Sequence, residues 1–298
     1  MRDNLSLDQL RTFIAAVDEG SFSAAARKLN RVQSAVSDLV AKLEANIGVP
    51  LFDRSSRYPA LTKEGTVLLA DARSILAGVD AMRARAKGIS SGIEAELSVV
   101  IDVMFPIASI TEAAKAFRET FPGTPLRIYV EVLGGAYEPL LDRRASLGIV
   151  GPLPAMPASL RSERLAGIAM VMVAAANHPL AAYPGTIPST ALAKHVQLVL
   201  TDRSPLSEGQ NFYVLSPFTW RLADLFAKRA FLLEGLGWGG MPRHAVEKDI
   251  EDGRLVVLSI EDIPAEGLLR PVSAVYPAAS PPGPAGRWFI ERLKGCVS

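Results

Sequence analysis

The segment 21–52 constrains the fold of this 298-residue chain most strongly, because two helical patterns flank a three-residue turn there. Ser21 is placed to cap a short helix over 24–29, residues 30–32 make a tight turn, and a second helix runs from about 33 to 46. Three successive alanines in the first helix supply small side chains where two helices approach closely. This spacing predicts a helix-turn-helix, whose second helix fits a DNA major groove.

The flanking residues complete a small helical domain with a wing. Apolar residues between 7 and 17 recur at helical spacing, and Gly48 ends the second helix of the motif. A polar, basic tip at 53–57 then separates two short extended pieces. We expect a two-stranded wing there, followed by a helix that Thr62 caps.

Polar side chains gather on the outer face of the second helix, near the end from which a recognition helix contacts base edges. A glutamine bonds adenine through two hydrogen bonds, and a serine bonds a base or a phosphate. Basic residues of the turn and wing flank this face, and we expect them to contact DNA phosphates. An ordinary helical bundle with polar outer residues is the alternative. The candidate DNA-binding residues are Ser21, Arg31, Gln33, Ser34, Ser37, Asp38, Arg54 and Arg57.

The distribution of charge supports a nucleic-acid partner more than the total does. The chain has 32 Lys and Arg against 31 Asp and Glu, but residues 21–63 hold seven basic side chains and three acidic ones. A basic patch on a nearly neutral chain favours double-stranded DNA as a partner. A solvated charged surface is the alternative interpretation.

A long helical pattern, from Lys63 to about Lys87, follows the wing. At 1.5 Å per residue such a helix is roughly 37 Å long, and a lone helix of that length does not bury its apolar stripe within its own chain. We expect it to pair with a second copy in a dimer. Packing on the next domain is the alternative. The glycines and serines at 88–92 predict a flexible hinge.

After the hinge, strand patterns alternate with helix patterns. This alternation predicts βαβ units, hence an α/β fold with a mostly parallel sheet. The expected strands are 97–103, 126–133, 147–150, 168–175, 196–201, 220–222, 255–258 and 268–276, and the expected helices are 106–121, 136–143, 225–234, 242–252 and 286–294.

Several classes of protein are disfavoured by composition. A single cysteine, Cys296, excludes an internal disulfide framework, and three scattered histidines do not suggest a metal cluster. Without a long apolar run or an export signal, we expect a soluble, cytoplasmic protein with no membrane partner. Neither a nucleophile elbow nor a phosphate-binding loop occurs, and the glycines at 235–240 indicate a helix C-cap. We therefore expect no enzyme, no metal and no cofactor.

Six motifs in the first 66 residues lie in one order: Leu10-Arg-Thr-Phe-Ile14, Gly20-Ser-Phe-Ser-Ala-Ala-Ala26, Gln33-Ser-Ala-Val-Ser37, Leu43-Glu44, Gly48-Val-Pro-Leu-Phe-Asp-Arg54 and Leu61-Thr-Lys-Glu-Gly65. Together they resemble the LysR-type transcriptional regulators of bacteria. Looser signals extend the resemblance beyond residue 90, at 117–122, 178–180 and 235–242. The resemblance implies an N-terminal winged helix-turn-helix with a long linker helix, then a two-lobed α/β effector domain resembling periplasmic binding proteins. It also implies a dimer through the linker helix, a homotetramer and a small-molecule inducer.

The same resemblance divides the chain. It places the DNA-binding domain at 1–62, the linker helix and hinge at 63–92, and the effector domain at 93–298. Within that domain, lobe I would hold 93–162 and 268–298, and lobe II would hold 163–267.

Carried over by position, Gln33, Ser34, Ser37 and Asp38 face the groove, and Arg54 is the wing's phosphate contact. Asp38 departs from the family pattern, in which many members carry a basic or neutral residue. A carboxylate near phosphates costs affinity unless it accepts from a cytosine amine or pairs with a neighbour such as Lys42.

Candidate effector-binding residues follow from the rule that ligands of open α/β sheets bind at the carboxyl ends of strands. A carboxylate directly after an apolar strand needs a partner, and aromatic side chains can form the walls of a cleft or belong to the core. The candidates are Asp102, Val103, Met104, Gly134, Asp202, Arg203, Phe218, Trp220 and Trp238. The aromatic and methionine residues hint at an aromatic or partly apolar acid as inducer.

These observations predict a sequence-specific DNA-binding regulator that a small molecule switches from the cleft between two lobes. Binding would change how the dimers are arranged on DNA, and thereby the access of RNA polymerase. One alternative is a small-molecule-binding module without specific DNA binding. Another is an enzyme on the same lobes, which would need a catalytic cluster at the strand ends.

Overall fold

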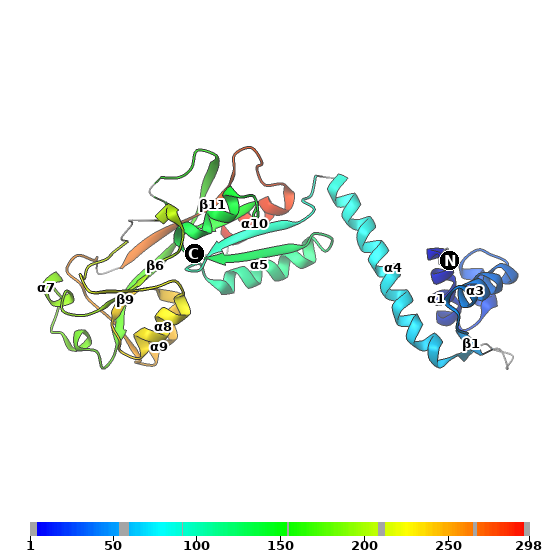
Figure 1. Ribbon diagram of the computed structural model, residues 1–298, viewed down its shortest axis with the longest axis horizontal. Helices are drawn as coiled ribbons and strands as arrows, with labels where there is room; N and C mark the ends of the chain where they lie inside the picture. Colours follow the sequence, from blue (N-terminus) through cyan, green and yellow to red (C-terminus); the bar gives the residue numbers. More distant parts are fainter. Residues whose placement is uncertain are drawn as a thin grey trace. The chain divides into compact units, whose positions relative to one another are not determined.

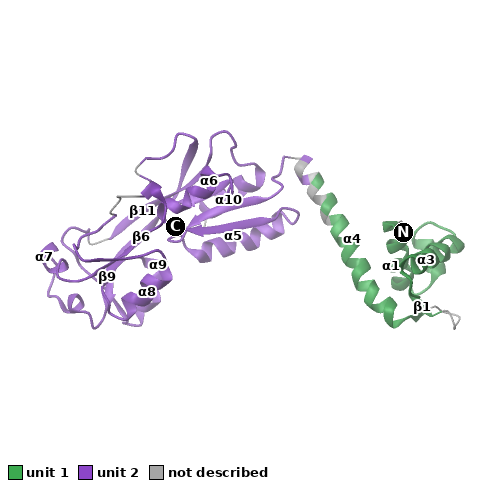
Figure 2. Cartoon of the chain, in the orientation of Figure 1, with its two compact units in different colours: residues 1–87 green, residues 88–298 purple. Residues whose placement is uncertain are grey.

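The computed structural model describes residues 5–53, 60–90, 92–153, 155–207, 212–264 and 267–294, and for residues 81, 84, 85, 87 and 89 it describes the backbone alone. The chain divides into two compact units, residues 1–87 and 88–298, which Figure 2 distinguishes by colour. Arg54, Arg57 and Cys296 lie outside the described residues.

Three short helices build the core of the first unit (Figure 1): α1 (Leu7–Asp18), α2 (Phe22–Lys28) and α3 (Gln33–Ile47). They pack around a buried cluster that includes Phe13, Ala25, Val36 and Leu43. Ser6 forms a capping box with Gln9 at the start of α1. The sequence places both helices of the motif within two residues of their observed ends.

A two-stranded wing follows, in which β1 (Phe52–Asp53) pairs antiparallel with β2 (Ala60–Leu61). Glu44 Oε1 accepts hydrogen bonds from the amides of Leu51 at 2.8 Å and Phe52 at 3.1 Å, which ties α3 to the wing. Helix α4 (Lys63–Ser90) begins at Thr62, whose Oγ1 accepts from the Gly65 amide at 2.8 Å. A Cβ at Gly65 would collide with the Leu51 carbonyl oxygen, so the close approach of α4 to this loop requires glycine.

In the described part of the second unit, nine strands form one sheet in the order β4-β3-β5-β11-β6-β9-β7-β8, with β10 paired to β6. We call β3 to β5 and their helices lobe I, and β7 to β10 and their helices lobe II; β6 and β11 run through both. The strands are β3 (Leu97–Asp102), β4 (Leu126–Glu131), β5 (Leu147–Val150), β6 (Leu160–Ala175), β7 (Gln197–Leu200), β8 (Thr219–Leu222), β9 (Trp238–Pro242), β10 (Leu255–Val257) and β11 (Leu268–Pro277).

The sheet is mixed, and the expectation of a mostly parallel sheet was wrong. Strand β3 is parallel to β4 and β5, and β7 is parallel to β8 and β9, but β6 and β11 run antiparallel to every neighbour. Strand β6 also begins eight residues before the apolar run at 168–175. Its first half is largely polar and pairs with β11, about a hundred residues away in the chain, so no local pattern could predict this pairing.

Helices cover both faces of the sheet, because alternate strand residues are buried on opposite sides. Val99 and Ile101 pack with α5 (Ile107–Thr120), whereas Val100 packs with the short α6 (Glu138–Leu141). The helix expected at 136–143 is therefore this shorter helix, preceded by the 3-10 turn η1 (Leu133–Ala136). The other elements are η2 (Pro179–Ala182), α7 (Ser189–Leu192), η3 (Pro205–Ser207), α8 (Leu225–Leu233), α9 (Arg243–Glu251) and α10 (Pro284–Lys294).

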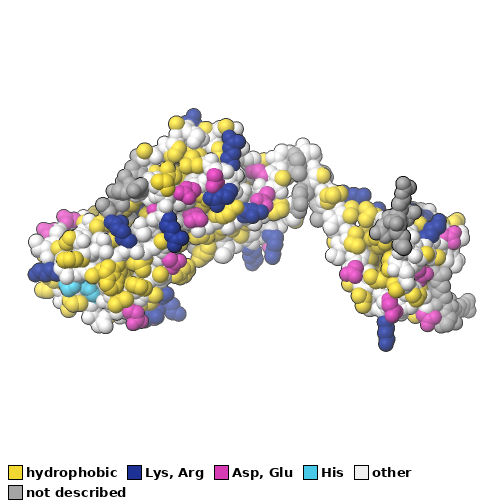
Figure 3. All heavy atoms as spheres, viewed as in Figure 1, with side chains coloured by type: hydrophobic (Ala, Val, Ile, Leu, Met, Phe, Trp, Pro, Cys, Tyr) yellow, Lys and Arg dark blue, Asp and Glu magenta, His cyan; other side chains and the backbone are white. Residues whose placement is uncertain are grey.

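Acidic and basic side chains are interspersed over the face of the second unit drawn in Figure 3. Among the described residues, no helix combines the length and the apolar character needed to span a membrane.

Candidate DNA-binding face and effector pocket

Helix α3 buries one side and exposes the other. Val36 and Val40 are fully buried in the core of the first unit. Val32, the residue before the helix, provides no side-chain cap, so the positive end of the helix dipole is open to an anion. The predicted groove-facing residues lie on the opposite side, where Gln33, Ser34 and Asp38 are exposed and Ser37 is half-buried.

Two other predicted DNA contacts have structural roles within the first unit. Ser21 Oγ accepts from the Ala24 amide at 3.2 Å and caps α2. Arg31 donates two hydrogen bonds to Asp8, at 2.8 and 2.9 Å, and this exposed ion pair joins the turn to α1. Arg31 would therefore have to share its charge between Asp8 and a phosphate.

Asp38 is exposed on α3, as is Lys42 one turn further on. Within the described part of the chain, no ion pair joins these two side chains. The carboxylate of Asp38 is thus available to accept from a base.

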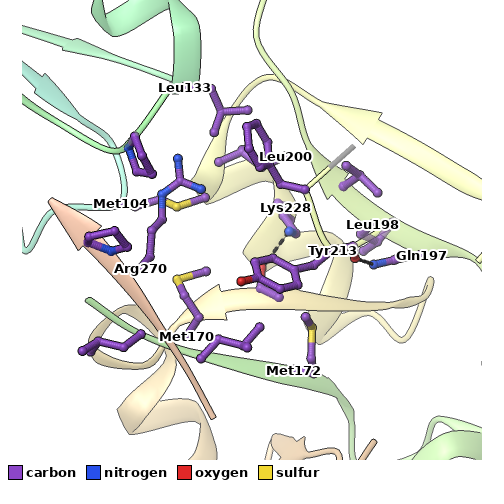
Figure 4. A pocket seen from close by; sticks show the side chains of 17 residues that line it. Met104, Leu133, Met170, Met172, Gln197, Leu198, Leu200, Tyr213, Lys228 and Arg270 are labelled. Atoms are coloured by element: carbon purple, nitrogen blue, oxygen red, sulfur yellow. Dashed lines mark hydrogen bonds between the residues drawn. The ribbon is translucent and has the colours of Figure 1, made fainter. Parts of the chain in front are cut away.

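A cavity of about 160 Å³ lies between the lobes of the second unit (Figure 4). For comparison, a protein cavity of roughly 150 Å³ holds one benzene molecule. Both lobes and both shared strands contribute to its largely apolar wall. The lining residues are Met104, Leu133, Pro152, Met170, Met172, Gln197, Leu198, Val199, Leu200, Phe212, Tyr213, Lys228, Gly240, Leu268, Leu269, Arg270 and Pro271.

Arg270 of β11 brings a guanidinium to this cavity, with only 11% of its side chain exposed. Its Nη2 lies 4.0 Å from Asp102 Oδ2, beyond hydrogen-bond distance. Arg270 Nε and Asp102 Oδ2 are both buried and have no hydrogen-bond partner among the described residues. The guanidinium lies over the ring of Phe212, 5.5 Å from its centroid, and a Cβ at Gly151 would come within 2.6 Å of it. Arg270 is therefore a largely buried cation whose Nε donor is unused.

Asp102 stands behind Arg270 at the end of β3. Its Oδ1 accepts from the Met104 amide at 2.9 Å. Burial raises the pKa of the Asp102 carboxyl, and the nearby guanidinium of Arg270 opposes this shift. Asp102 does not line the cavity, but its carboxylate lies beside Arg270, which does.

Lys228 of α8 is a second buried cation in the same cavity, with 4% of its surface exposed. Its Nζ donates to the Gly240 carbonyl oxygen at 2.7 Å. Burial lowers the pKa of the Lys228 amine to about 8.

Gln197 of β7 positions one wall of the cavity. Its Oε1 accepts from the amides of Leu215 at 2.7 Å and Ser216 at 3.0 Å, and its Nε2 donates to the Tyr213 carbonyl oxygen at 2.7 Å. These three bonds hold the loop that carries Phe212 and Tyr213.

The structure brings only one predicted effector residue, Met104, to the wall of this cavity. Val103 packs against the core. Asp202 and Arg203 instead line a second, more polar hollow, where Asp202 Oδ2 accepts from the Gly135 amide at 2.8 Å. A Cβ at Gly134 would lie 3.0 Å from the same oxygen. These residues join lobe I to lobe II beside the cavity.

None of the three predicted aromatic residues lines the cavity. Phe218 is 60% exposed, and Trp220 on the edge strand β8 packs against Phe231. Trp238 is fully buried in a cluster with Met172 and Leu180 and does not line the cavity. Trp238 is therefore a core residue of β9 rather than part of the cavity wall.

Sequence reasoning missed the two cations. Arg270 falls within a predicted strand and Lys228 within a predicted helix. Both lie away from the carboxyl ends of strands, where ligand-binding residues are expected. For Arg270 the available signal was a single charged residue inside an apolar strand pattern; Lys228 stands beside Arg229, and nothing in the pattern separates the two.

No group of three or more His, Cys, Asp or Glu side chains suited to a metal ion occurs among the described residues. A winged helix-turn-helix with an exposed second helix, followed by two α/β lobes around a cavity, defines a ligand-responsive DNA-binding protein.

Comparison with known proteins gives the family. Residues 7–66 match the family model described as bacterial regulatory helix-turn-helix protein, lysR family, and residues 90–296 match the LysR substrate binding domain. The chain belongs to the LysR family of DNA-binding transcriptional regulators, which carry an effector-binding domain and are not enzymes.

Named relatives span most of the chain. The probable HTH-type transcriptional regulator YhaJ of Escherichia coli is 34% identical over 266 residues, covering 86% of this chain and 87% of that protein. The regulator AceR of Acinetobacter baumannii is 27% identical, covering 98% and 97%. A solved Corynebacterium glutamicum OxyR C206 mutant shares the fold at a TM-score of 0.60 and 22% identity, covering 99% and 93%.

Proposed function

We propose that α3 reads a specific DNA site through Gln33, Ser34, Ser37 and Asp38, and that a single-ring carboxylic acid in the inter-lobe cavity switches the regulator. The amphipathic burial of α3 supports the first part, because its core side is fixed while its polar side is free. Arg54 and Arg57 of the wing, with Ser21 and Arg31, are proposed as the flanking phosphate contacts.

The observation that carries the effector class is Arg270. A buried guanidinium with an unpaired Nε, beside an apolar space of about 160 Å³, suits a carboxylate attached to one ring. The carboxylate of such a ligand would accept hydrogen bonds from Arg270, and its ring would pack against the apolar wall of the cavity. Charge-assisted bonds of this kind are the strong ones in a dry site.

The same geometry suggests how binding is transmitted. The wall combines residues of lobe I, such as Met104, with residues of lobe II, such as Leu200, and Arg270 lies on a strand shared by both. A ligand that contacts all three favours one arrangement of the lobes, and only such differential affinity shifts an equilibrium. We propose that this shift changes the DNA bend and the access of RNA polymerase.

The proposed assembly is a homotetramer made of two dimers, each of which pairs through α4. Val67, Ile75 and Met82 are large apolar side chains exposed on this helix, at 67%, 44% and 64%. A second copy would cover them. We propose the domain boundaries 1–62, 63–92 and 93–298, and a cytoplasmic location, where a bacterial regulator meets its DNA.

Calorimetric titration of the full-length protein with benzoate tests the effector class. Benzamide, a neutral ligand of similar shape, should bind at least tenfold more weakly. Arg270→Met should abolish benzoate binding, while Arg118→Met, at an exposed site on α5, should leave it unchanged. Equal binding of benzoate and benzamide, or benzoate binding that survives Arg270→Met, would refute the proposal.

A further inference from the structure

Within the described residues, one hydrogen bond to the Gly240 carbonyl oxygen is the only contact of Lys228 that an apolar residue could not make. Lys228 lies on the core side of α8, close to Leu225 and Leu232, which are buried in the main apolar cluster. Burying an ammonium group there costs free energy unless its hydrogen bonds are made. Methionine would fill the same space without that cost.

The hydrogen bonds of Lys228 are incomplete. An ammonium group has three N–H donors, and the structure gives Nζ one acceptor, the Gly240 carbonyl oxygen at 2.7 Å. Within the described residues, Lys228 forms no ion pair with a carboxylate. The described residues supply no oxygen atom for the remaining donors.

The position of the amine shows where those atoms would come from. Lys228 lines the same cavity as Arg270, and Figure 4 shows both cationic side chains directed toward it from different elements. Arg270 comes from β11 and Lys228 from α8. One ligand in this cavity therefore meets two separate cationic anchors.

We infer that Lys228 is a specificity-determining residue that selects ring acids carrying a second acceptor oxygen, as a hydroxyl, an oxo group or a second carboxylate. This inference rests on the proposed function, in which Arg270 binds the first carboxylate. A simple ring acid satisfies Arg270 and leaves the ammonium of Lys228 incompletely bonded. An acid with a second oxygen satisfies both.

The inference predicts a ranking of ligands for the wild-type protein. Benzoate, 3-hydroxybenzoate, 4-hydroxybenzoate, isophthalate and terephthalate would be titrated calorimetrically into the full-length protein at pH 7. At least one of the four ligands with a second oxygen should bind at least tenfold more tightly than benzoate, because it completes the bonds of Lys228.

Variants assign that preference to the amine. Lys228→Met should reduce the preference for a second oxygen to less than twofold. Lys194→Met, at an exposed lysine of lobe II, is the matched control and should keep the full preference. The wild-type ranking needs no variant, so a folding defect in Lys228→Met would not remove the test.

The outcomes separate the two proposals. If benzoate binds through Arg270 but the second oxygen gives no gain, or if the gain survives Lys228→Met, the inference about Lys228 is overturned and the proposed function stands. If none of the acids binds, or if binding is indifferent to Arg270→Met, the proposed function falls and the inference falls with it.

Discussion

The DNA-binding face and the effector pocket place their polar residues in opposite environments. On α3, Gln33 and Asp38 are exposed on a helix whose other side is buried. In the pocket, Arg270 and Lys228 are buried among apolar side chains and have unused donors. A polar group on the surface costs little without its ligand, whereas a buried one costs stability until the ligand arrives. Changes in the pocket should therefore alter stability and binding together, and changes on α3 should alter binding alone.

The largest effect should come from Arg270→Met, because it leaves Asp102 buried without its charge partner. We expect the free energy of unfolding to fall by about 3–5 kcal/mol and benzoate binding to be lost, as measured by urea denaturation and calorimetry. The double variant Arg270→Met/Asp102→Asn should recover most of the stability, because the carboxylate is gone, but it should not recover binding. If the double variant bound benzoate, the anchoring role of Arg270 would be wrong.

Lys228→Met should have the opposite effect on stability. The pKa of Lys228 is about 8 in the folded protein against an ordinary value of 10.5, so the unfolded chain holds the proton more tightly. The variant should be more stable by up to about 3 kcal/mol at pH 7.

The pH dependence of the stability difference between Lys228→Met and the wild type shows whether the charge of Lys228 causes it. Below pH 8 both states of the wild type carry the charge and the cost is full. Between pH 8 and 10.5 the folded state loses the proton first, so wild-type stability rises and the gap should close. Urea denaturation at several pH values measures the gap, and a constant gap would show that packing, rather than charge, causes it.

These two regions also differ in how far the sequence could predict them. The helix-turn-helix is local: its turn, the start of α3 at Gln33 and the cap at Thr62 are all set by neighbours within a few residues. The pocket is assembled from β6, β7, β11, α8 and loops far apart in the chain. No local pattern indicates that Lys228 is buried in the pocket wall, or that Trp238 is buried in a core cluster instead. Asp102 was expected to need a partner; the cation beside it, Arg270, lies 168 residues away in the chain on a strand whose direction was not predicted.

On the exposed face, Gln33→Ala should weaken binding to the specific site by about 1–3 kcal/mol, because a bidentate base contact is lost. Binding to unrelated DNA and the free energy of unfolding should stay the same, since Gln33 is exposed. Fluorescence anisotropy with specific and unrelated duplexes measures the difference. A comparable loss on both duplexes would show that Gln33 contacts the phosphate backbone instead.

The smallest effect is expected from Asp38→Asn. Removing one exposed carboxylate next to phosphates should strengthen binding to unrelated DNA severalfold at low salt, and the gain should shrink as salt screens it. A salt series in the same assay measures this change. If specific binding fell instead, Asp38 would be accepting from a cytosine amine at the site.

The most direct test of this division is fluorescence anisotropy on DNA from upstream of the protein's own gene, with unrelated competitor DNA and without effector. The wild type, Gln33→Ala and the stable double variant Arg270→Met/Asp102→Asn would be compared. We predict that the wild type and the double variant bind tightly and resist competitor, while Gln33→Ala loses that selectivity. Loss of selectivity in the double variant, or its retention in Gln33→Ala, would contradict the assignment of DNA reading to α3 and of switching to the pocket.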